Sequence, residues 1–264
     1  MLKIGSALDV GRQREGKANQ DNLAVVKKGW LSKRPPLLVL ADGMGGYNGG
    51  EIAARLVVQE MSAAWRKAPA RQEPLKTLKA GVNQAHAAIK AAASKKDELS
   101  HMGSTVVAGV IQDGFLYITN VGDSRAYLIN QHEIRLVSHD HSFVADQVRA
   151  GLITPLEALT HPKRNVLSMS LTARRESVEP YLTKMPFGEE DILLLCSDGL
   201  WGPVPEAIIQ AVVLEQPPQE AAQKLVDLAN ANQGPDNISV IIACHQRQGR
   251  TAEDNDSDLE DTQP

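Results

Sequence analysis

The sequence predicts an α+β protein, a β-sandwich with helices on both of its outer faces. Short runs of β-branched and aliphatic residues, each bounded by Gly, Asp, Asn or Pro, are typical of strands. Two pairs of segments carry apolar residues at helical spacing, and several of the strands separate the pairs. Because every helix and sheet must bury an apolar face, this order favours a layered sandwich. With 264 residues, 42% of them hydrophobic, the chain is long enough for one such domain.

Several segments have the composition of strands. Gln112-Asp113-Gly114 separates two of them and is typical of a hairpin turn. Leu193, Leu194 and Leu195 form a continuous apolar run, which indicates a strand that is covered on both faces. The predicted strands are Leu23–Val26, Leu37–Ala41, Thr105–Ile111, Phe115–Thr119, Arg125–Ile129, Ile192–Cys196 and Ile238–Ala243.

The helices are predicted from their apolar spacing. In the first of them, Ile52, Leu56, Val57 and Met61 lie close to helical spacing. The third has a proline near its first turn, where the missing N–H costs no hydrogen bond. The predicted helices are Glu51–Lys67, Leu75–Ala93, Pro205–Leu214 and Gln219–Ala231.

Residues 145–185 interrupt this rhythm of strands and helices. They mix proline, polar and basic residues, as in Leu152-Ile153-Thr154-Pro155 and His161-Pro162-Lys163-Arg164-Asn165, and they contain no strong strand. A long irregular insert in a compact domain is often a functional lid.

The C-terminus is acidic and almost without aliphatic residues. Such a segment buries too little surface to offset its ordering entropy, so we expect residues 247–264 to be a disordered tail after a domain spanning residues 1–246. The tail is either a solvated extension or a docking or autoinhibitory element for a basic cleft.

Charge and cysteine content narrow the class of protein. The net charge of −4 argues against a nucleic-acid-binding protein, which usually needs a basic face. Cys196 and Cys244 have neither zinc-site spacing nor the density of a disulfide-rich secreted domain, which indicates buried, reduced thiols. The N-terminus lacks the pattern of a signal peptide, and no apolar run approaches the roughly 20 residues of a spanning helix. We therefore expect a cytoplasmic protein without a membrane partner.

Four aspartates lie in short glycine- or asparagine-linked motifs. They are Asp21 in Asn19-Gln20-Asp21-Asn22, Asp42 in Ala41-Asp42-Gly43-Met44-Gly45-Gly46, Asp198 in Cys196-Ser197-Asp198-Gly199-Leu200-Trp201-Gly202 and Asp236 in Gly234-Pro235-Asp236-Asn237. Mg²⁺ and Mn²⁺ prefer carboxylate, carbonyl and water oxygens. A single Asp-Gly after a strand is usually only a turn. Together, however, the motifs indicate a divalent metal site.

In this order the motifs resemble the metal-dependent protein serine/threonine phosphatases of the PPM (PP2C) family, and bacterial single-domain members most of all. The resemblance covers roughly residues 5–243. It implies a four-layer α-β-β-α sandwich in which helix pairs flank two central, mostly antiparallel sheets. It also implies that residues 145–185 form a flap beside the metal site.

The resemblance also implies a set of metal ligands. Asp42 would bridge two Mn²⁺ or Mg²⁺ ions, the Gly43 carbonyl would bind one of them, and Asp198 and Asp236 would hold the other. The paired ions would lower the pKa of a bridging water, which then attacks the phosphorus of a phosphoserine or phosphothreonine. Asp42, Asp198 and Asp236 are thus the expected catalytic residues.

Two further segments match the family. Asp21 would order metal-bound water. Asp123, in Gly122-Asp123-Ser124-Arg125, would join Asp198 at a third, weaker metal. Met102-Gly103-Ser104-Thr105 fits a packing and turn element near the core strands.

The chain departs from the family pattern near its start. Gly16 stands where many relatives have the arginine that binds phosphate, so Arg14 is the favoured phosphate ligand, because its planar fork suits phosphate oxygens, and Lys17 is the alternative. Gln20 replaces a common glutamate, which predicts weaker binding of the second metal. Met44 stands where the animal branch has a proton-donating histidine.

The sequence gives weaker functional evidence for several other residues. Ser142, in His139-Asp140-His141-Ser142, is expected to cap a helix that opens the flap. His161 and Arg164 would face a phosphopeptide. Cys244 to Arg250 has the C-x5-R spacing of cysteine-dependent phosphatases, but it lacks the phosphate-binding loop and helix that this chemistry requires.

The resulting hypothesis is a monomeric protein phosphatase. Its partners would be phosphorylated proteins, including a Ser/Thr kinase and the substrates of that kinase. Two alternatives stay open at this point. One is a family member without activity that serves as a binding module, and the other is a metal-dependent hydrolase of a different phosphoester such as a nucleotide.

Overall fold

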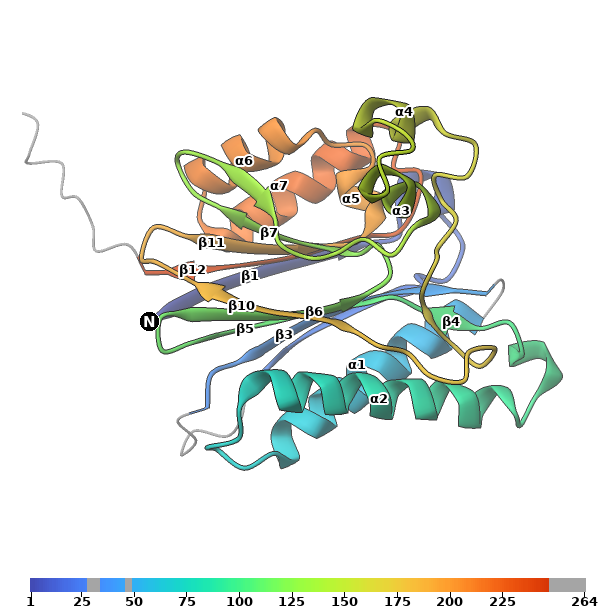
Figure 1. Cartoon of the computed structure of the whole chain (residues 1–264). Helices are drawn as coiled ribbons and strands as arrows, with labels where there is room; N and C mark the ends of the chain where they lie inside the picture. The colour runs from blue at the N-terminus through green and yellow to red at the C-terminus, as the bar shows by residue number, and fades with distance from the viewer. Residues whose placement is uncertain (28–33, 46–48, 247–264) are drawn as a thin grey trace, which may run out of the picture.

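Two antiparallel sheets packed face to face form the centre of the molecule (Figure 1). The computed structural model describes residues 1–27, 34–45 and 49–246. The first sheet has the strand order β1-β12-β11-β7-β8. These strands are β1 (Leu2–Asp9), β12 (Ile238–His245), β11 (Ile192–Cys196), β7 (Arg125–Ile129) and β8 (Ile134–Leu136).

The second sheet has seven strands in the order β10-β6-β5-β3-β4-β9, with β2 paired to β3. Its strands are β10 (Tyr181–Pro186), β6 (Phe115–Val121), β5 (Val106–Gln112), β3 (Leu37–Met44), β4 (Gly103–Ser104), β9 (Leu171–Thr172) and β2 (Asp21–Val26). The hairpin between β5 and β6 turns at Asp113 and Gly114, which both have positive φ, as the sequence predicts for this turn.

Helices cover both outer faces of the sandwich. In Figure 1, α1 and α2 lie below the seven-stranded sheet, and α6 and α7 lie above the five-stranded sheet. The helices are α1 (Gly49–Lys67), α2 (Pro74–Ala93), α3 (Phe143–Arg149), α4 (Pro155–Thr160), α5 (Asp198–Trp201), α6 (Glu206–Glu215) and α7 (Pro218–Ala231), with the 3₁₀ turns η1 (Arg12–Arg14) and η2 (Asp97–Leu99). The four-layer α-β-β-α architecture is confirmed.

Alternating side chains along the strands divide the core into three layers. In β3, Leu37 and Val39 pack towards α1 and α2, whereas Leu38 and Leu40 pack between the sheets. A strand turns successive side chains to opposite faces, so a central strand of a covered sandwich must be apolar throughout. The predicted run Leu193–Leu195 follows this rule, with Leu194 facing α7 and its neighbours facing the other sheet.

The expectation that residues 145–185 contain no strong strand is wrong at the end of this segment. Tyr181–Pro186 forms β10, which pairs with β6 at the edge of the seven-stranded sheet. Earlier in the segment, α3 and α4 lie above the sandwich beside α5 (Figure 1). The sequence prediction also omitted β1, whose eight residues pair with β12. The acidic tail lies outside the described residues.

No helix among the described residues is long and apolar enough to cross a membrane.

Candidate functional site

The predicted metal-binding aspartates come from both sheets. Asp21 is the first residue of β2 and pairs across the sheet with Asp42 of β3. Asp42 was expected to follow its strand, but β3 continues to Met44, so the carboxylate projects from the strand itself. A Cβ at Gly43 would lie 2.0 Å from the carbonyl oxygen of Gly50. The Asp-Gly sequence is therefore needed for the close approach of α1 to β3.

The other two motifs lie on the five-stranded sheet and contact each other. Asp198 opens α5 immediately after β11, and Asp236 lies just before β12. A Cβ at Gly199 would lie 2.0 Å from the backbone oxygen of Asn237. The Asn237 amide N–H donates to Asp236 Oδ1 at 2.7 Å, and the Asn237 side chain accepts from the Gln20 N–H at 2.8 Å. Asn237 thus ties the Asp236 turn to the residue before Asp21.

Two serines hold the carboxylate of Asp21. The hydroxyls of Ser197 and Ser239 each donate to Asp21 Oδ2 at 2.7 Å. The other oxygen, Oδ1, is buried and has no hydrogen-bond partner in the described part of the chain. The sequence prediction gave neither serine a role, although Ser197 lies inside the Asp198 motif and Ser239 follows the Asp236 motif by two residues.

The carboxylates strongly affect one another. Burial, and then the charges of Asp21, Asp198, Asp123 and Asp236, raise the pKa of Asp42 well above its usual range. Burial and the nearby carboxylates of Asp123, Asp236 and Asp21 also raise the pKa of Asp198 well above its usual range. Burial is also the main reason that the pKa of Asp21 rises to about 7. A cluster of this kind needs cations before all its members can ionise.

The donor set suits hydrated Mg²⁺ or Mn²⁺. One oxygen each of Asp21 and Asp198 is buried without a hydrogen-bond partner among the described residues. Within the same residues, no three acidic, histidine or cysteine side chains close into a single metal cage. The absence of a closed cage in the described part of the chain agrees with the unpaired oxygens, because Mg²⁺ usually keeps several waters and takes only one or two carboxylates directly. An open group of aspartates fits such ions better than a closed cage.

The Gly-Ser-Thr segment holds the backbone of Asp42. The Asp42 N–H donates to Thr105 Oγ1 at 3.0 Å, and the Asp42 carbonyl accepts from the Thr105 N–H and from Ser104 Oγ at 2.8 and 3.0 Å. Thr105 Oγ1 also lies 2.7 Å from Ser124 Oγ, next to Asp123. The predicted structural role of this segment agrees with these contacts.

The favoured phosphate ligand lies at the aspartate group. Arg14, at the end of η1, contacts Asp236 Oδ1 through Nε at 2.8 Å and through Nη2 at 2.5 Å. Its side chain is 28% exposed, whereas Lys17 is fully on the surface. The structure therefore brings Arg14, and not Lys17, into contact with a predicted metal ligand.

Comparison with known proteins decides the family. The protein phosphatase 2C profile matches residues 10–236. The chain belongs to the protein phosphatase 2C family. Among curated relatives, it is 34% identical to the serine/threonine phosphatase stp of Listeria monocytogenes over 238 residues, which is 89% of this chain and 92% of that protein.

Solved structures of bacterial phosphatases share the fold. The serine/threonine phosphatase Stp1 from Staphylococcus aureus superposes with a TM-score of 0.85 at 32% identity, covering 93% of this chain and 96% of that one. The catalytic domain of the serine/threonine protein phosphatase PstP, in complex with two manganese ions, superposes with a TM-score of 0.79 at 33% identity, covering 92% and 97%. The protein is a metal-dependent phosphatase of this bacterial type.

In the phosphatase, Asp123 lies in a network that the sequence prediction did not resolve. Its carbonyl accepts from Trp201 Nε1 at 3.1 Å. Arg125 stacks on Trp201 with its guanidinium carbon 3.7 Å from the ring centre, and contacts Asp140 Oδ2 through Nε and Nη2 at 2.9 and 2.7 Å. Burial, followed by the charge of Asp140, raises the pKa of Asp123 to about 6.

The segment His139–Ser142 joins this network to α3. Ser142 is the N-cap of α3 and accepts from the Ala145 N–H, as predicted. His141 Nδ1 accepts from the Gly122 N–H at 3.2 Å, and burial lowers the pKa of His141 to about 4. His141 is therefore a neutral side chain that connects the start of the flap to the Asp123 loop.

The remaining candidates lie away from the aspartates or outside the described residues. The ring of His161 packs against Phe143 of α3, and Arg164 is exposed. Cys196 is a buried thiol, and Arg250 of the C-x5-R spacing lies outside the described residues. Met44, which stands where the animal branch has a histidine, has Gly103 as a neighbour.

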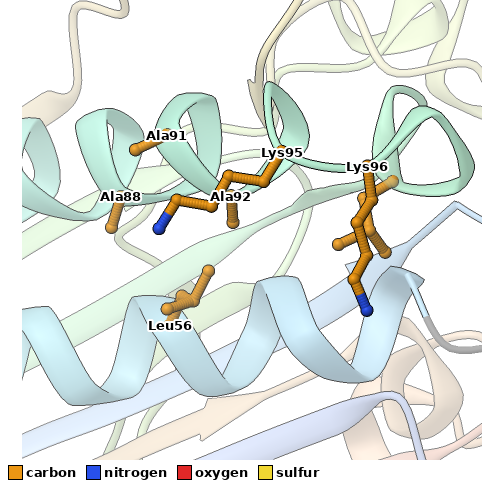
Figure 2. A pocket seen from close by; sticks show the side chains of 7 residues that line it. Leu56, Ala88, Ala91, Ala92, Lys95 and Lys96 are labelled. Atoms are coloured by element: carbon orange, nitrogen blue, oxygen red, sulfur yellow. The ribbon is translucent and has the colours of Figure 1, made fainter.

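A hollow of about 340 Å³ lies between α1 and α2 (Figure 2). Its lining is apolar except for two lysines, and it contains no carboxylate. The lining residues are Leu56, Ala88, Ala91, Ala92, Lys95, Lys96 and Leu99. It shares no residue with the aspartate group, so it is separate from the phosphatase site.

Proposed function

We propose that the protein hydrolyses phosphoserine and phosphothreonine in proteins at its group of aspartates. The observation that carries this proposal is the buried oxygens of Asp21 and Asp198, which have no hydrogen-bond partner among the described residues, beside Asp42, which pairs with Asp21. Burial, and then the surrounding carboxylates, raise the pKa values of Asp42 and Asp198 in agreement with this. Such a cluster calls for cations, and the family to which the chain belongs uses them for phosphoester hydrolysis. The relatives named serine/threonine phosphatase support the same substrate class.

The aspartates have unequal roles in this proposal. Asp42, Asp198 and Asp236 would hold two Mn²⁺ or Mg²⁺ ions, with the Gly43 carbonyl as a further ligand, and Asp123 would help to hold a third. The bound ions would supply an activated water and offset charge on the phosphoryl oxygens. Asp21, which Ser197 and Ser239 hold through one oxygen, would use its other oxygen to orient water.

Arg14 would bind the substrate phosphate. Its guanidinium already lies against Asp236, so a phosphate beside the metal ligands would be within reach of the same fork. Lys17 is the weaker candidate because its side chain points into solvent.

The proposed site also suggests an oligomeric state, a domain organisation and a class of partner. All the carboxylates come from one chain, so we propose a monomer with a catalytic domain at residues 1–246, a flap at about 145–185 and a separate acidic tail. The natural opponent of the enzyme would be a Ser/Thr protein kinase that shares its substrates. Cys196, a buried cysteine that forms no disulfide, fits a reducing compartment such as the cytoplasm.

The test is release of inorganic phosphate from a phosphothreonine peptide in the presence of Mn²⁺. We expect activity with the wild-type chain, loss of activity in EDTA, and at least a 100-fold lower kcat for Asp42→Asn, because charge stabilisation at such sites is worth about 10²–10³ in rate. Asp113→Asn, in the distant β5–β6 turn, is the control and should keep full activity. Activity that survives both EDTA and Asp42→Asn would contradict the proposal.

A further inference from the structure

Arg125 connects three segments that meet at the aspartate group. It is the first residue of β7, two positions after Asp123, and its side chain is only 20% exposed. One edge of the guanidinium contacts the carboxylate of Asp140, at the start of the flap, through Nε and Nη2. Nη1 donates to the Tyr127 hydroxyl at 2.9 Å.

The flat face of the same guanidinium covers Trp201, the last residue of α5. The guanidinium carbon lies 3.7 Å from the centre of the indole ring. Trp201 in turn donates its indole N–H to the carbonyl oxygen of Asp123 at 3.1 Å. Because α5 has only four residues and begins at Asp198, the position of Trp201 also sets the position of Asp198.

The loop between β6 and β7 is fixed from the opposite side as well. Ser124 Oγ lies 2.7 Å from Thr105 Oγ1, which accepts from the backbone N–H of Asp42. Gly122 exchanges hydrogen bonds with His141 at the start of the flap. Each residue from Gly122 to Arg125 therefore contacts another segment of the site or its surroundings.

We propose that Arg125 is a positioning residue of the metal site, which fixes Asp198 relative to Asp123 by clamping Trp201 and Asp140. The inference rests on the proposed function, because it assigns Arg125 a role at the third, weaker metal. Arginine is needed, since only a planar guanidinium both stacks on an indole ring and forks onto a carboxylate. Lysine would keep the charge but lose both contacts.

The experiment compares Arg125→Lys, Arg125→Met and Trp201→Phe with the wild type in the full chain. Mn²⁺ binding is measured by calorimetry, kcat and KM on a phosphothreonine peptide, and unfolding by thermal melting in EDTA. Groups that orient metal ligands from outside typically contribute 10–100-fold to metal affinity or activity. We expect a loss of this size in the affinity of the weakest Mn²⁺ site and in kcat, with KM nearly unchanged.

The variants separate positioning from general stability. Trp201→Phe keeps an aromatic ring under Arg125 but removes the N–H that bonds Asp123, so it should weaken Mn²⁺ binding while hardly changing the melting temperature. Arg125→Lys should be no better than Arg125→Met. Arg135→Met is the control, because Arg135 is an exposed arginine of the adjacent strand β8 and pairs with Glu133 at 3.5 Å.

Some outcomes would overturn the inference. Lower melting temperatures with unchanged Mn²⁺ affinity and kcat would show that Arg125 only stabilises the fold. Full rescue by Arg125→Lys would show that its charge alone matters. If Arg125→Met does not fold, Trp201→Phe decides the question. Mn²⁺ binding without phosphate release by the wild type would contradict only the proposed function, whereas absence of Mn²⁺ binding would contradict both.

Discussion

At the scale of a residue, the carboxylate of Asp21 is held in place by one oxygen and leaves its other oxygen open to a ligand. Two serine hydroxyls satisfy one of its oxygens, while the other is buried without a partner in the described structure. A buried polar atom without a hydrogen bond destabilises a fold by about 1–3 kcal/mol. The fold therefore holds an oxygen in place that only water or a cation can satisfy.

Single substitutions can also distinguish between Arg14 and Lys17 as the ligand of the substrate phosphate. Arg14→Ala should raise KM for a phosphothreonine peptide about 10–100-fold, because hydrogen bonds to a charged group contribute about 1.5–3 kcal/mol. It should also change Mn²⁺ affinity, since Arg14 contacts Asp236. Steady-state kinetics and calorimetry measure the two effects. Lys17→Ala should change neither by more than about twofold, and the opposite pattern would assign the phosphate to Lys17.

At the scale of elements, the turns that carry Asp198 and Asp236 are closely packed against each other. Gly199→Ala would place a methyl group 2.0 Å from the backbone oxygen of Asn237, so α5 or the Asp236 turn must shift. Overpacking of this kind typically costs about 1–3 kcal/mol. We expect a lower free energy of unfolding in urea and a lower Mn²⁺ affinity.

A second glycine controls for the loss of backbone freedom. A Cβ at Gly188 meets its nearest atom at 3.5 Å, an ordinary contact with the Asp191 side chain. Gly188→Ala should therefore leave both stability and metal binding nearly unchanged. Equal effects of the two substitutions would contradict the close approach of α5 to the Asn237 backbone.

The elements that were predictable from sequence are those with a regular apolar pattern, on both faces of a central strand or on one face of a helix. All seven predicted strands and all four predicted helices are present, with small shifts at their ends. β1 and β10 were missed because they lie at sheet edges, where side chains such as Lys3 and Lys184 face solvent and weaken the pattern. The aspartates were recognisable by their motifs. Ser239, Asn237 and Arg125 acquire their contacts only through tertiary packing, which no local pattern shows.

At the scale of the whole molecule, metal-free stability should fall as pH rises above about 6.5. The folded pKa of Asp21 is about 7 and those of Asp42 and Asp198 are raised well above the usual aspartate value, so the folded state binds protons that the unfolded state has lost. Stability then falls by up to about 1.4 kcal/mol per pH unit for each such proton. Urea unfolding in EDTA between pH 6.5 and 8 measures this slope.

The urea experiment begins at pH 6.5 because, below this pH, His141 makes stability rise with pH. Its folded pKa of about 4 is depressed from 6.5, so stability is lost as pH falls through that range. Saturating Mn²⁺ should remove the decline between pH 6.5 and 8, because it binds the ionised carboxylates. Asp42→Asn should make the slope in EDTA shallower. A flat or rising curve for the metal-free wild type would show that the carboxylates are ionised without metal.

The pairing of β1 with β12 determines when a newly made chain can become active. Leu2 lies opposite His245, so β1 must wait during synthesis for the last described strand before its sheet can close. Contacts between such distant segments form slowly. Asp198 and Asp236 belong to the same late part of the chain, whereas Asp21 and Asp42 lie on the paired strands β2 and β3, which are synthesised much earlier. A growing chain therefore carries Asp21 and Asp42 through most of synthesis and gains the ability to hydrolyse phosphoesters only as the domain is completed.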